Sequence, residues 1–81
     1  MDGFGSEASK DGKVYMGTFQ NGQKHGEGMM TYSNQKQYRG EWRKNVKHGI
    51  GVEINLIIKS QRSGEWRHGK WMRWVSDTQK I

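Results

Sequence analysis

The sequence contains no cysteine, which excludes a disulfide framework and a thiolate metal site. This absence is consistent with a reducing compartment. Apolar runs are no longer than the three residues of Leu56–Ile58, far short of the roughly 18 needed for a membrane-spanning helix. The first residues also lack the basic flank and hydrophobic segment of a signal peptide. We therefore expect a soluble, intracellular protein without a transmembrane segment.

Apolar side chains are scarce as well. Only 31% of the 81 residues are hydrophobic, while 12 are glycine. A single domain of this size buries a modest fraction of its surface, so we expect marginal stability. Four tryptophans, three tyrosines and two phenylalanines are present, and these aromatic residues must carry the packing.

What the chain does have is a tandem repeat. Six positions recur with fixed spacing after 23 residues: Tyr15, Gly17, Phe19, His25, Gly26 and Gly28 return as Tyr38, Gly40, Trp42, His48, Gly49 and Gly51. Gly64 and Trp66 follow the second copy after 24 residues, which places one inserted residue between Asn55 and Ser60. Stacked repeats contact mainly their neighbours and present an extended surface, which favours binding over catalysis.

The element Tyr-x-Gly-x-Trp/Phe, followed by a turn and then His-Gly-x-Gly, resembles the MORN repeat. The resemblance spans about residues 2–71 and is specific, because all six positions recur in both copies. The repeat register predicts the organisation of the chain. We expect a partial N-terminal repeat over 1–12, repeats over 13–35 and 36–59, a truncated repeat with a cap over 60–75, and a tail over 76–81.

Side-chain alternation predicts an all-β fold, a single-layer antiparallel meander of β-hairpins with a C-terminal aromatic cap. The dipeptide Asn21-Gly22 is a strong signal for a tight turn between the two strands of the first copy. Glycines on the aromatic face make room for rings. We expect a grooved face on which Tyr15 and Phe19 lie over Gly26 and Gly28, and Tyr38 and Trp42 over Gly49 and Gly51.

The opposite face of the second copy carries an alternating apolar row, namely Ile50, Val52, Ile54, Leu56 and Ile58. Exposed apolar patches of this kind mark interfaces. Two coverings stay open, the stretch 71–75 folded back over the row or a partner protein. The third copy is expected to stop after its first strand and turn, with Trp71 and Trp74 as capping residues and a polar tail that is frayed or held by a partner.

The net charge is +6, and the stretch 36–73 holds ten Lys or Arg against three acidic residues. Such a surface attracts acidic partners, although plain solubility is the simplest explanation. Four basic residues are expected to lie together around the second hairpin turn: Arg39, Arg43, Lys44 and Lys47. Nucleic acid is disfavoured as the partner, because the aromatic residues that would stack on bases are committed to packing.

The sequence indicates no catalytic site, metal site or cofactor. His25 and His48 occupy equivalent positions, and each is expected to hydrogen-bond its hairpin turn. Acids and histidines from different copies are not expected to converge on one site. Neither glycine-rich string is followed by Lys-Ser/Thr or a helix, so neither is a phosphate loop.

We therefore expect a non-catalytic scaffold that binds protein subunits of a larger assembly. The resemblance implies a cytoplasmic, cytoskeletal setting such as the axoneme of a cilium. It also implies an alternative, a peripheral module that binds acidic phospholipids, because MORN repeats occur in phosphatidylinositol phosphate kinases and in junctional proteins near membranes. Such binding would depend on electrostatics and weaken with salt.

Overall fold

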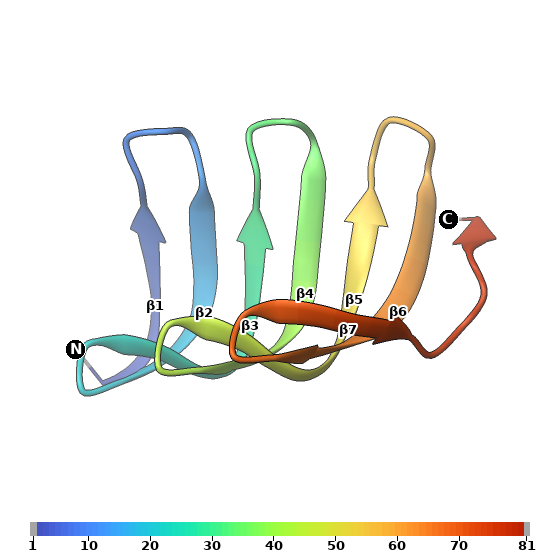
Figure 1. Ribbon diagram of the computed structural model, residues 1–81. Coiled ribbons are helices and arrows are strands. Elements are labelled where there is room, and N and C mark those ends of the chain that lie inside the picture. Colours follow the sequence, from blue (N-terminus) through green and yellow to red (C-terminus); the bar gives the residue numbers. More distant parts are fainter. Residues whose placement is uncertain (1, 81) are drawn as a thin grey trace.

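A computed structural model describes residues 2–80 as one antiparallel sheet (Figure 1). Strands β1 to β7 follow one another in spatial order, and β8 pairs with β6. The strands are β1 (Gly3–Ala8), β2 (Val14–Gln20), β3 (Gln23–Thr31), β4 (Lys36–Arg43), β5 (Val46–Asn55), β6 (Ser60–Arg67), β7 (Lys70–Trp74) and β8 (Gln79–Lys80). The predicted single-layer meander is confirmed. Within residues 2–80 we find no helix with the length and hydropathy needed to span a bilayer.

Three two-residue turns join the hairpins β2–β3, β4–β5 and β6–β7. In each turn both central residues have positive φ: Asn21-Gly22, Lys44-Asn45 and His68-Gly69. Turns of this type match the twist of the flanking strands, which is why Asn-Gly is such a strong signal. The predicted turn at Asn21-Gly22 is confirmed, and the other two occupy the equivalent repeat positions.

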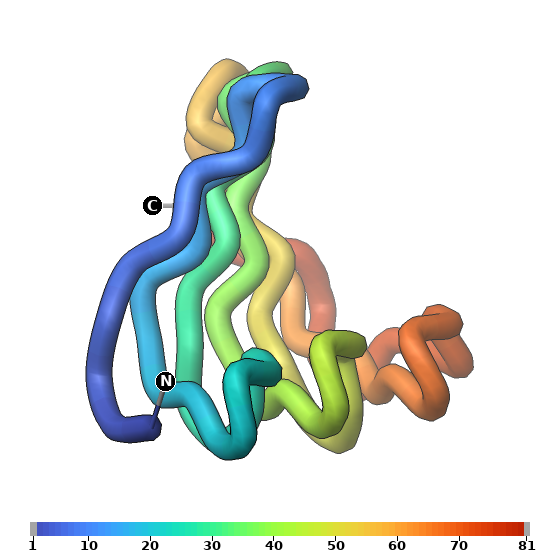
Figure 2. The backbone as a smooth tube through the Cα atoms, turned by 90° about the vertical axis from the view of Figure 1, so that its left-hand side faces the viewer, coloured from blue at the N-terminus to red at the C-terminus, as the bar shows by residue number. Residues whose placement is uncertain are grey.

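The sheet is bent along a line that crosses every repeat. The strand register shifts between Gly17 and Phe19 in the first hairpin and between Gly40 and Trp42 in the second. On the facing strands, Gly26 and Gly49 have φ values of 85° and 74°, which residues with a Cβ rarely adopt. Figure 2 shows the result, because the three tight turns project sideways from the upper part of the sheet. The bend creates a concave face.

The core is a file of aromatic rings on that face. Five of the seven buried hydrophobic side chains are aromatic, so these residues do carry the packing. Successive rings meet edge to face at centroid distances of 4.9 to 5.3 Å, in the order Phe19, Tyr15, Trp42, Tyr38, Trp66. We call these five residues the aromatic ladder. Edge-to-face pairs are favourable beyond the area they bury.

Polar tips of the ladder bond to backbone carbonyls. The Tyr15 hydroxyl donates to the Thr18 carbonyl at 2.9 Å, and the Tyr38 hydroxyl donates to the Glu41 carbonyl at 3.0 Å. Both carbonyls belong to residues at the register shifts, where the regular strand pairing is interrupted. The Trp42 indole nitrogen donates to the Gly28 carbonyl at 3.2 Å. Each repeat is thereby fixed to its neighbour.

Two of the four glycines predicted to lie under rings do so. A Cβ at Gly28 would overlap the Tyr15 ring, and one at Gly51 would overlap the Tyr38 ring. For Gly26 and Gly49 the prediction is wrong. A Cβ there would meet the side chains of Thr18 and Glu41 instead, because these two glycines form the bend through their positive φ.

The predicted end of the third repeat is also wrong. Strand β7 forms and pairs with β6, although the His-Gly-x-Gly motif is missing. The tail continues along the same edge, where the Val75 amide donates to the Ser63 carbonyl at 2.9 Å and the Ser63 amide donates to Ser76 Oγ at 2.9 Å. The backbone groups of β6 need partners whatever the sequence of the next strand. The predicted tail residue Ile81 lies outside the described residues.

The inserted residue lies in the loop between β5 and β6. That loop has four residues, Leu56–Lys59. The equivalent loop between β3 and β4 closes around three residues, because the Tyr32 amide donates to the Lys36 carbonyl at 2.8 Å. The predicted position between Asn55 and Ser60 is therefore confirmed.

Candidate partner-binding groove

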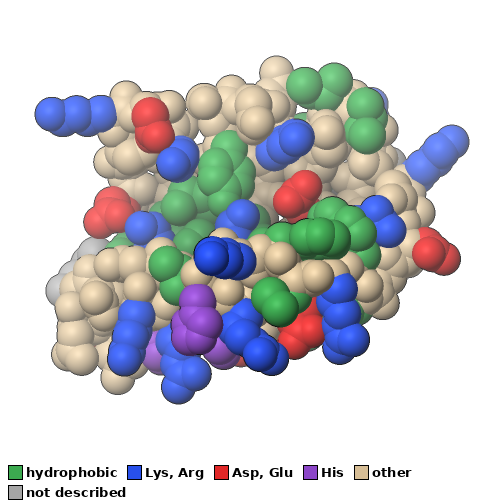
Figure 3. Space-filling view, in the orientation of Figure 1, with side chains coloured by type: hydrophobic (Ala, Val, Ile, Leu, Met, Phe, Trp, Pro, Cys, Tyr) green, Lys and Arg blue, Asp and Glu red, His purple; other side chains and the backbone are tan. Residues whose placement is uncertain are grey.

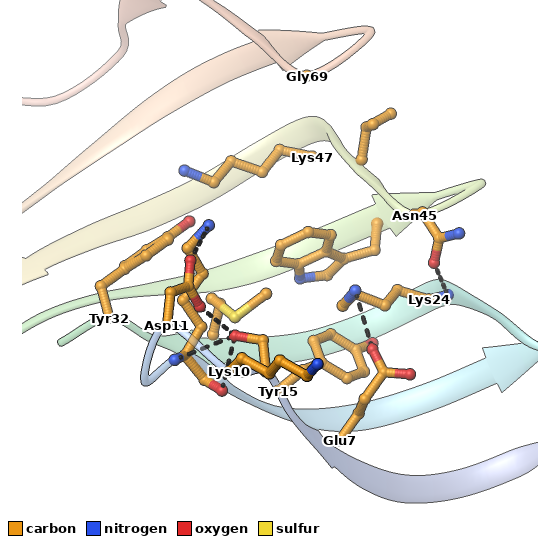
Figure 4. A pocket seen from close by; sticks show the side chains of 14 residues that line it. Glu7, Lys10, Asp11, Tyr15, Lys24, Tyr32, Asn45, Lys47 and Gly69 are labelled. Carbon is orange, nitrogen blue, oxygen red and sulfur yellow. Dashed lines mark hydrogen bonds and ion pairs between the residues drawn. The ribbon is translucent and has the colours of Figure 1, made fainter.

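A groove of about 550 Å³ lies on the concave face (Figure 4). The aromatic rings of Tyr15, Trp42 and Tyr32 line it, and the charged side chains come from elements far apart in sequence. The charged lining residues are Glu7, Lys10, Asp11, Lys13, Lys24 and Lys47. The groove thus combines ring faces with ammonium groups.

Lys47 is the central cation of the groove. Its ammonium nitrogen lies 4.8 Å from the ring centroid of Tyr38, 5.1 Å from that of Tyr32 and 5.6 Å from that of Trp66. An ammonium in this position is attracted by the negative face of each ring. Among residues 2–80 no carboxylate forms an ion pair with Lys47. Its charge is therefore available to an anionic group entering the groove.

The other lysines near the groove are already paired. Lys24 lies 3.3 Å from a carboxylate oxygen of Glu7 and 5.6 Å from the Tyr15 ring centroid. Lys13 forms an ion pair with Asp11 at 3.2 Å. Hydrogen bonds from Ser9 and Lys13 lower the pKa of the Asp11 carboxyl below its ordinary value.

Hydrogen bonds between repeats hold Lys24 and Lys47 in place. The Asn45 amide donates to the Lys24 carbonyl at 3.0 Å, and Asn45 Oδ1 accepts from the Lys24 amide at 2.8 Å. One repeat further, the Gly69 amide donates to the Lys47 carbonyl at 3.0 Å. Sequence reasoning missed Lys24, although both lysines immediately precede His-Gly-x-Gly and this recurrence was the available signal.

The predicted apolar row is not a continuous face. Strand β5 ends at Asn55, so Leu56 and Ile58 belong to the following loop. Asn55 Oδ1 accepts hydrogen bonds from the amides of Ile57 and Ile58, a local turn that ends the strand. Of the residues within the strand, Ile54 is buried, Val52 is half-buried and Ile50 is exposed. The stretch 71–75 does not cover them, because β7 extends the sheet beside β6.

The predicted basic cluster is also divided. Arg39 and Arg43 alternate along β4 with the buried Tyr38 and Trp42, so they lie on the opposite face from the groove. Lys47 lies over the ladder rings of the concave face. Arg43 and Lys44, with Val46, His48 and His68, line a separate cavity of about 320 Å³.

The histidines differ from expectation. Within residues 2–80 neither His25 nor His48 hydrogen-bonds its turn through the ring, and the Thr18 hydroxyl donates to the His25 carbonyl instead. The rings of His48 and His68 lie 6.5 Å apart, although they come from successive repeats. No three potential metal-ligating side chains of the described residues gather at one point.

Alkaline pH is expected to destabilise the fold through two ladder residues. Burial raises the pKa of Tyr15 and of Tyr38, and Glu27 and Glu41 respectively add to the effect. The unfolded chain ionises these phenols near pH 10, so stability is fully present below about pH 10 and falls above it. The measurement is tyrosinate absorbance together with tryptophan fluorescence during a pH titration. Complete ionisation of every tyrosine near pH 10, with unchanged fluorescence, would contradict this expectation.

The repeat pattern is matched by a family model. The model, described as MORN repeat, matches residues 15–37, 38–54 and 63–73. The first two segments begin at the ladder tyrosines Tyr15 and Tyr38, and the third covers Trp66 with its following turn. Together the three segments cover more than half of the chain.

Proposed function

Because the chain belongs to the MORN repeat family, we propose that it is a non-catalytic subunit of a larger assembly and binds a partner segment in its concave groove. MORN repeats are generally modules for interaction with proteins or membrane lipids. The observation that carries the proposal is the groove itself, whose rings and whose Lys47 ammonium face an open volume of about 550 Å³. Such concave sites with a few placed polar groups are where partners bind.

The chemistry of the groove favours an acidic partner segment with apolar side chains. Ring faces of Tyr15 and Trp42 supply apolar contact area, and Lys47 supplies a charge without a carboxylate of its own. A partner carboxylate would gain an ion pair there, and the positive surface would increase its rate of encounter. Glu7 and Asp11 support a binding role rather than acid–base chemistry, because each is held in an ion pair with a lysine.

We further propose a cytoplasmic setting in a cytoskeletal assembly, such as the axoneme of a cilium. This proposal is supported by the resemblance to small repeat proteins of such assemblies and by the extended shape of the sheet, which measures 35 × 23 × 18 Å. A sheet of stacked repeats bridges subunits by shape.

Charge reversal of Lys47 tests the proposal. Lys47→Glu is expected to reduce the retention of specific protein partners by about tenfold or more, because it replaces the free groove cation with an anion. Lys70→Glu is the matched control, since Lys70 is an exposed lysine outside the groove lining. The measurement is affinity purification from native lysate with quantitative mass spectrometry, followed by titration with the partner's acidic segment. Identical retention by both variants would overturn the groove as the binding site.

The alternative function, binding of acidic phospholipids such as phosphoinositides, cannot use the predicted basic cluster as one surface. Arg39 and Lys47 lie on opposite faces of the sheet. A different part of the molecule favours contact with lipid, the row of loops at the end of the sheet opposite the tight turns (Figure 1).

A further inference from the structure

The loop between β5 and β6 exposes three consecutive aliphatic side chains. Leu56 is 42% exposed, and Ile57 and Ile58 are each 67% exposed. The equivalent loops of the other repeats are polar, with the sequences Lys10-Asp11-Gly12 and Ser33-Asn34-Gln35. Scattered exposed aliphatics are ordinary, but three together at a loop tip indicate an interaction site. The property belongs to this loop alone, the one that carries the inserted residue.

The aliphatic loop is held in its exposed conformation. The Leu56 amide donates to the Gln35 carbonyl of the neighbouring loop at 3.0 Å. Asn55 Oδ1 accepts from the Ile57 amide at 3.0 Å and from the Ile58 amide at 3.3 Å. Because the backbone is fixed before any contact, docking of this loop requires little loss of conformational entropy.

Lysines accompany the aliphatic loop along the same end of the sheet. We define the loop row as residues 9–13, 32–36 and 56–59, which form the upper edge in Figure 1. Figure 3 shows apolar side chains at the β5–β6 loop and Lys and Arg side chains at either side. Four exposed lysines belong to the row, Lys10, Lys13, Lys36 and Lys59. Its single acid, Asp11, is paired with Lys13, so the row has an excess of positive charge.

We propose that the loop row docks on an anionic lipid surface, with Leu56, Ile57 and Ile58 inserted at the boundary between headgroups and acyl chains. The protruding shape suits a soft planar surface, which can contact all three loops at once. Insertion to a depth of roughly 5–10 Å would remove the aliphatic side chains from water. The lysines would meet acidic headgroups, each adding to the attraction near the surface.

This site is distinct from the proposed function of the groove. Lys47 and the ladder rings lie on the concave face, whereas Leu56, Ile57 and Ile58 form the tip of a loop and none of them lines the groove. The two sites therefore fail or succeed separately. Lys47→Glu is expected to leave lipid binding unchanged, and substitution of Ile57 and Ile58 is expected to leave protein partners unchanged.

Insertion is tested with a fluorescent label, which the absence of native cysteine makes specific. An environment-sensitive label on Ile57→Cys is expected to shift to shorter wavelength with vesicles of phosphatidylcholine and phosphatidylserine. A label on Gln20→Cys, an exposed residue beside the first tight turn, is expected to stay unchanged. Vesicles of phosphatidylcholine alone should give a much smaller shift at position 57, because the lysines then lack anionic partners.

Co-sedimentation with the same vesicles separates the aliphatic contribution from charge. Ile57→Ser with Ile58→Ser is expected to weaken binding by about tenfold or more, because the inserted apolar area is lost. Ile50→Ser is the matched control, an aliphatic residue that is 49% exposed on strand β5. Thermal melting of each variant verifies that it is folded.

Three outcomes would overturn the proposal: no binding to the acidic vesicles, binding without a shift of the label at position 57, or equal binding by the double variant and Ile50→Ser. The first would point to a protein pocket as the occupant of the aliphatic loop. The second and third would indicate electrostatic adsorption through another surface.

Discussion

Gly51→Ala is expected to unfold the protein or lower its free energy of unfolding by about 3 kcal/mol or more. A Cβ at this position would overlap the ring of Tyr38, whose side chain is fully buried. The ring cannot move aside, because it lies between Trp42 and Trp66 in the aromatic ladder. A loss of this size is a large part of the stability available to a small domain. Thermal melting followed by tryptophan fluorescence measures it.

Gly64→Ala provides the graded control for this prediction. Its Cβ would lie 3.0 Å from the nearest carbon atoms of Trp66, which can yield by a few tenths of an ångström. We therefore expect a smaller loss, on the order of 1 kcal/mol. A melting temperature of Gly51→Ala equal to that of Gly64→Ala would contradict the close contact between glycine and tyrosine.

Trp42→Ala is expected to lower the free energy of unfolding by about 3–5 kcal/mol, the range for removal of a large aromatic residue from a core. Trp42 is the middle member of the ladder and touches Tyr15 and Tyr38, each at a centroid distance of 5.3 Å. Its indole also donates to the Gly28 carbonyl, which would be left without that partner. Urea unfolding monitored by circular dichroism measures the change.

Trp71→Ala makes the same chemical change at a site with little burial. Trp71 is 51% exposed and lies beside Trp74 at the edge of the sheet. The expected loss is below about 1 kcal/mol, as for other surface substitutions. Equal losses for Trp71→Ala and Trp42→Ala would show that the ladder is not the main source of stability.

The regular part of the fold could be predicted because each repeat position has a local physical reason. Alternation placed Tyr15 and Phe19 on one face, and Asn21-Gly22 supplied the two positive φ values of the turn. The bend could not be predicted, because glycine in a strand is compatible both with a ring above it and with a positive φ. Gly28 takes the first role and Gly26 the second.

The candidate groove was only partly accessible from sequence. The notion of an aromatic-lined concave face follows from the spacing of tyrosine and glycine, but the placement of Lys47 over three rings depends on the bend. The apolar row failed as a prediction for a local reason. Asn55 ends the strand by accepting two amides of the next loop, and this moves Leu56 and Ile58 off the strand face.

The bonds from each tight turn to the preceding repeat have a consequence for how recognition can be divided. The groove extends from Glu7 in β1 to Gly69 in the last turn, and its lysines are fixed by amides of the repeat that follows them. No single hairpin therefore owns a binding site. Recognition is a collective property with a threshold length, so removal of one hairpin would abolish the site, whereas addition of one would lengthen it by a fixed increment.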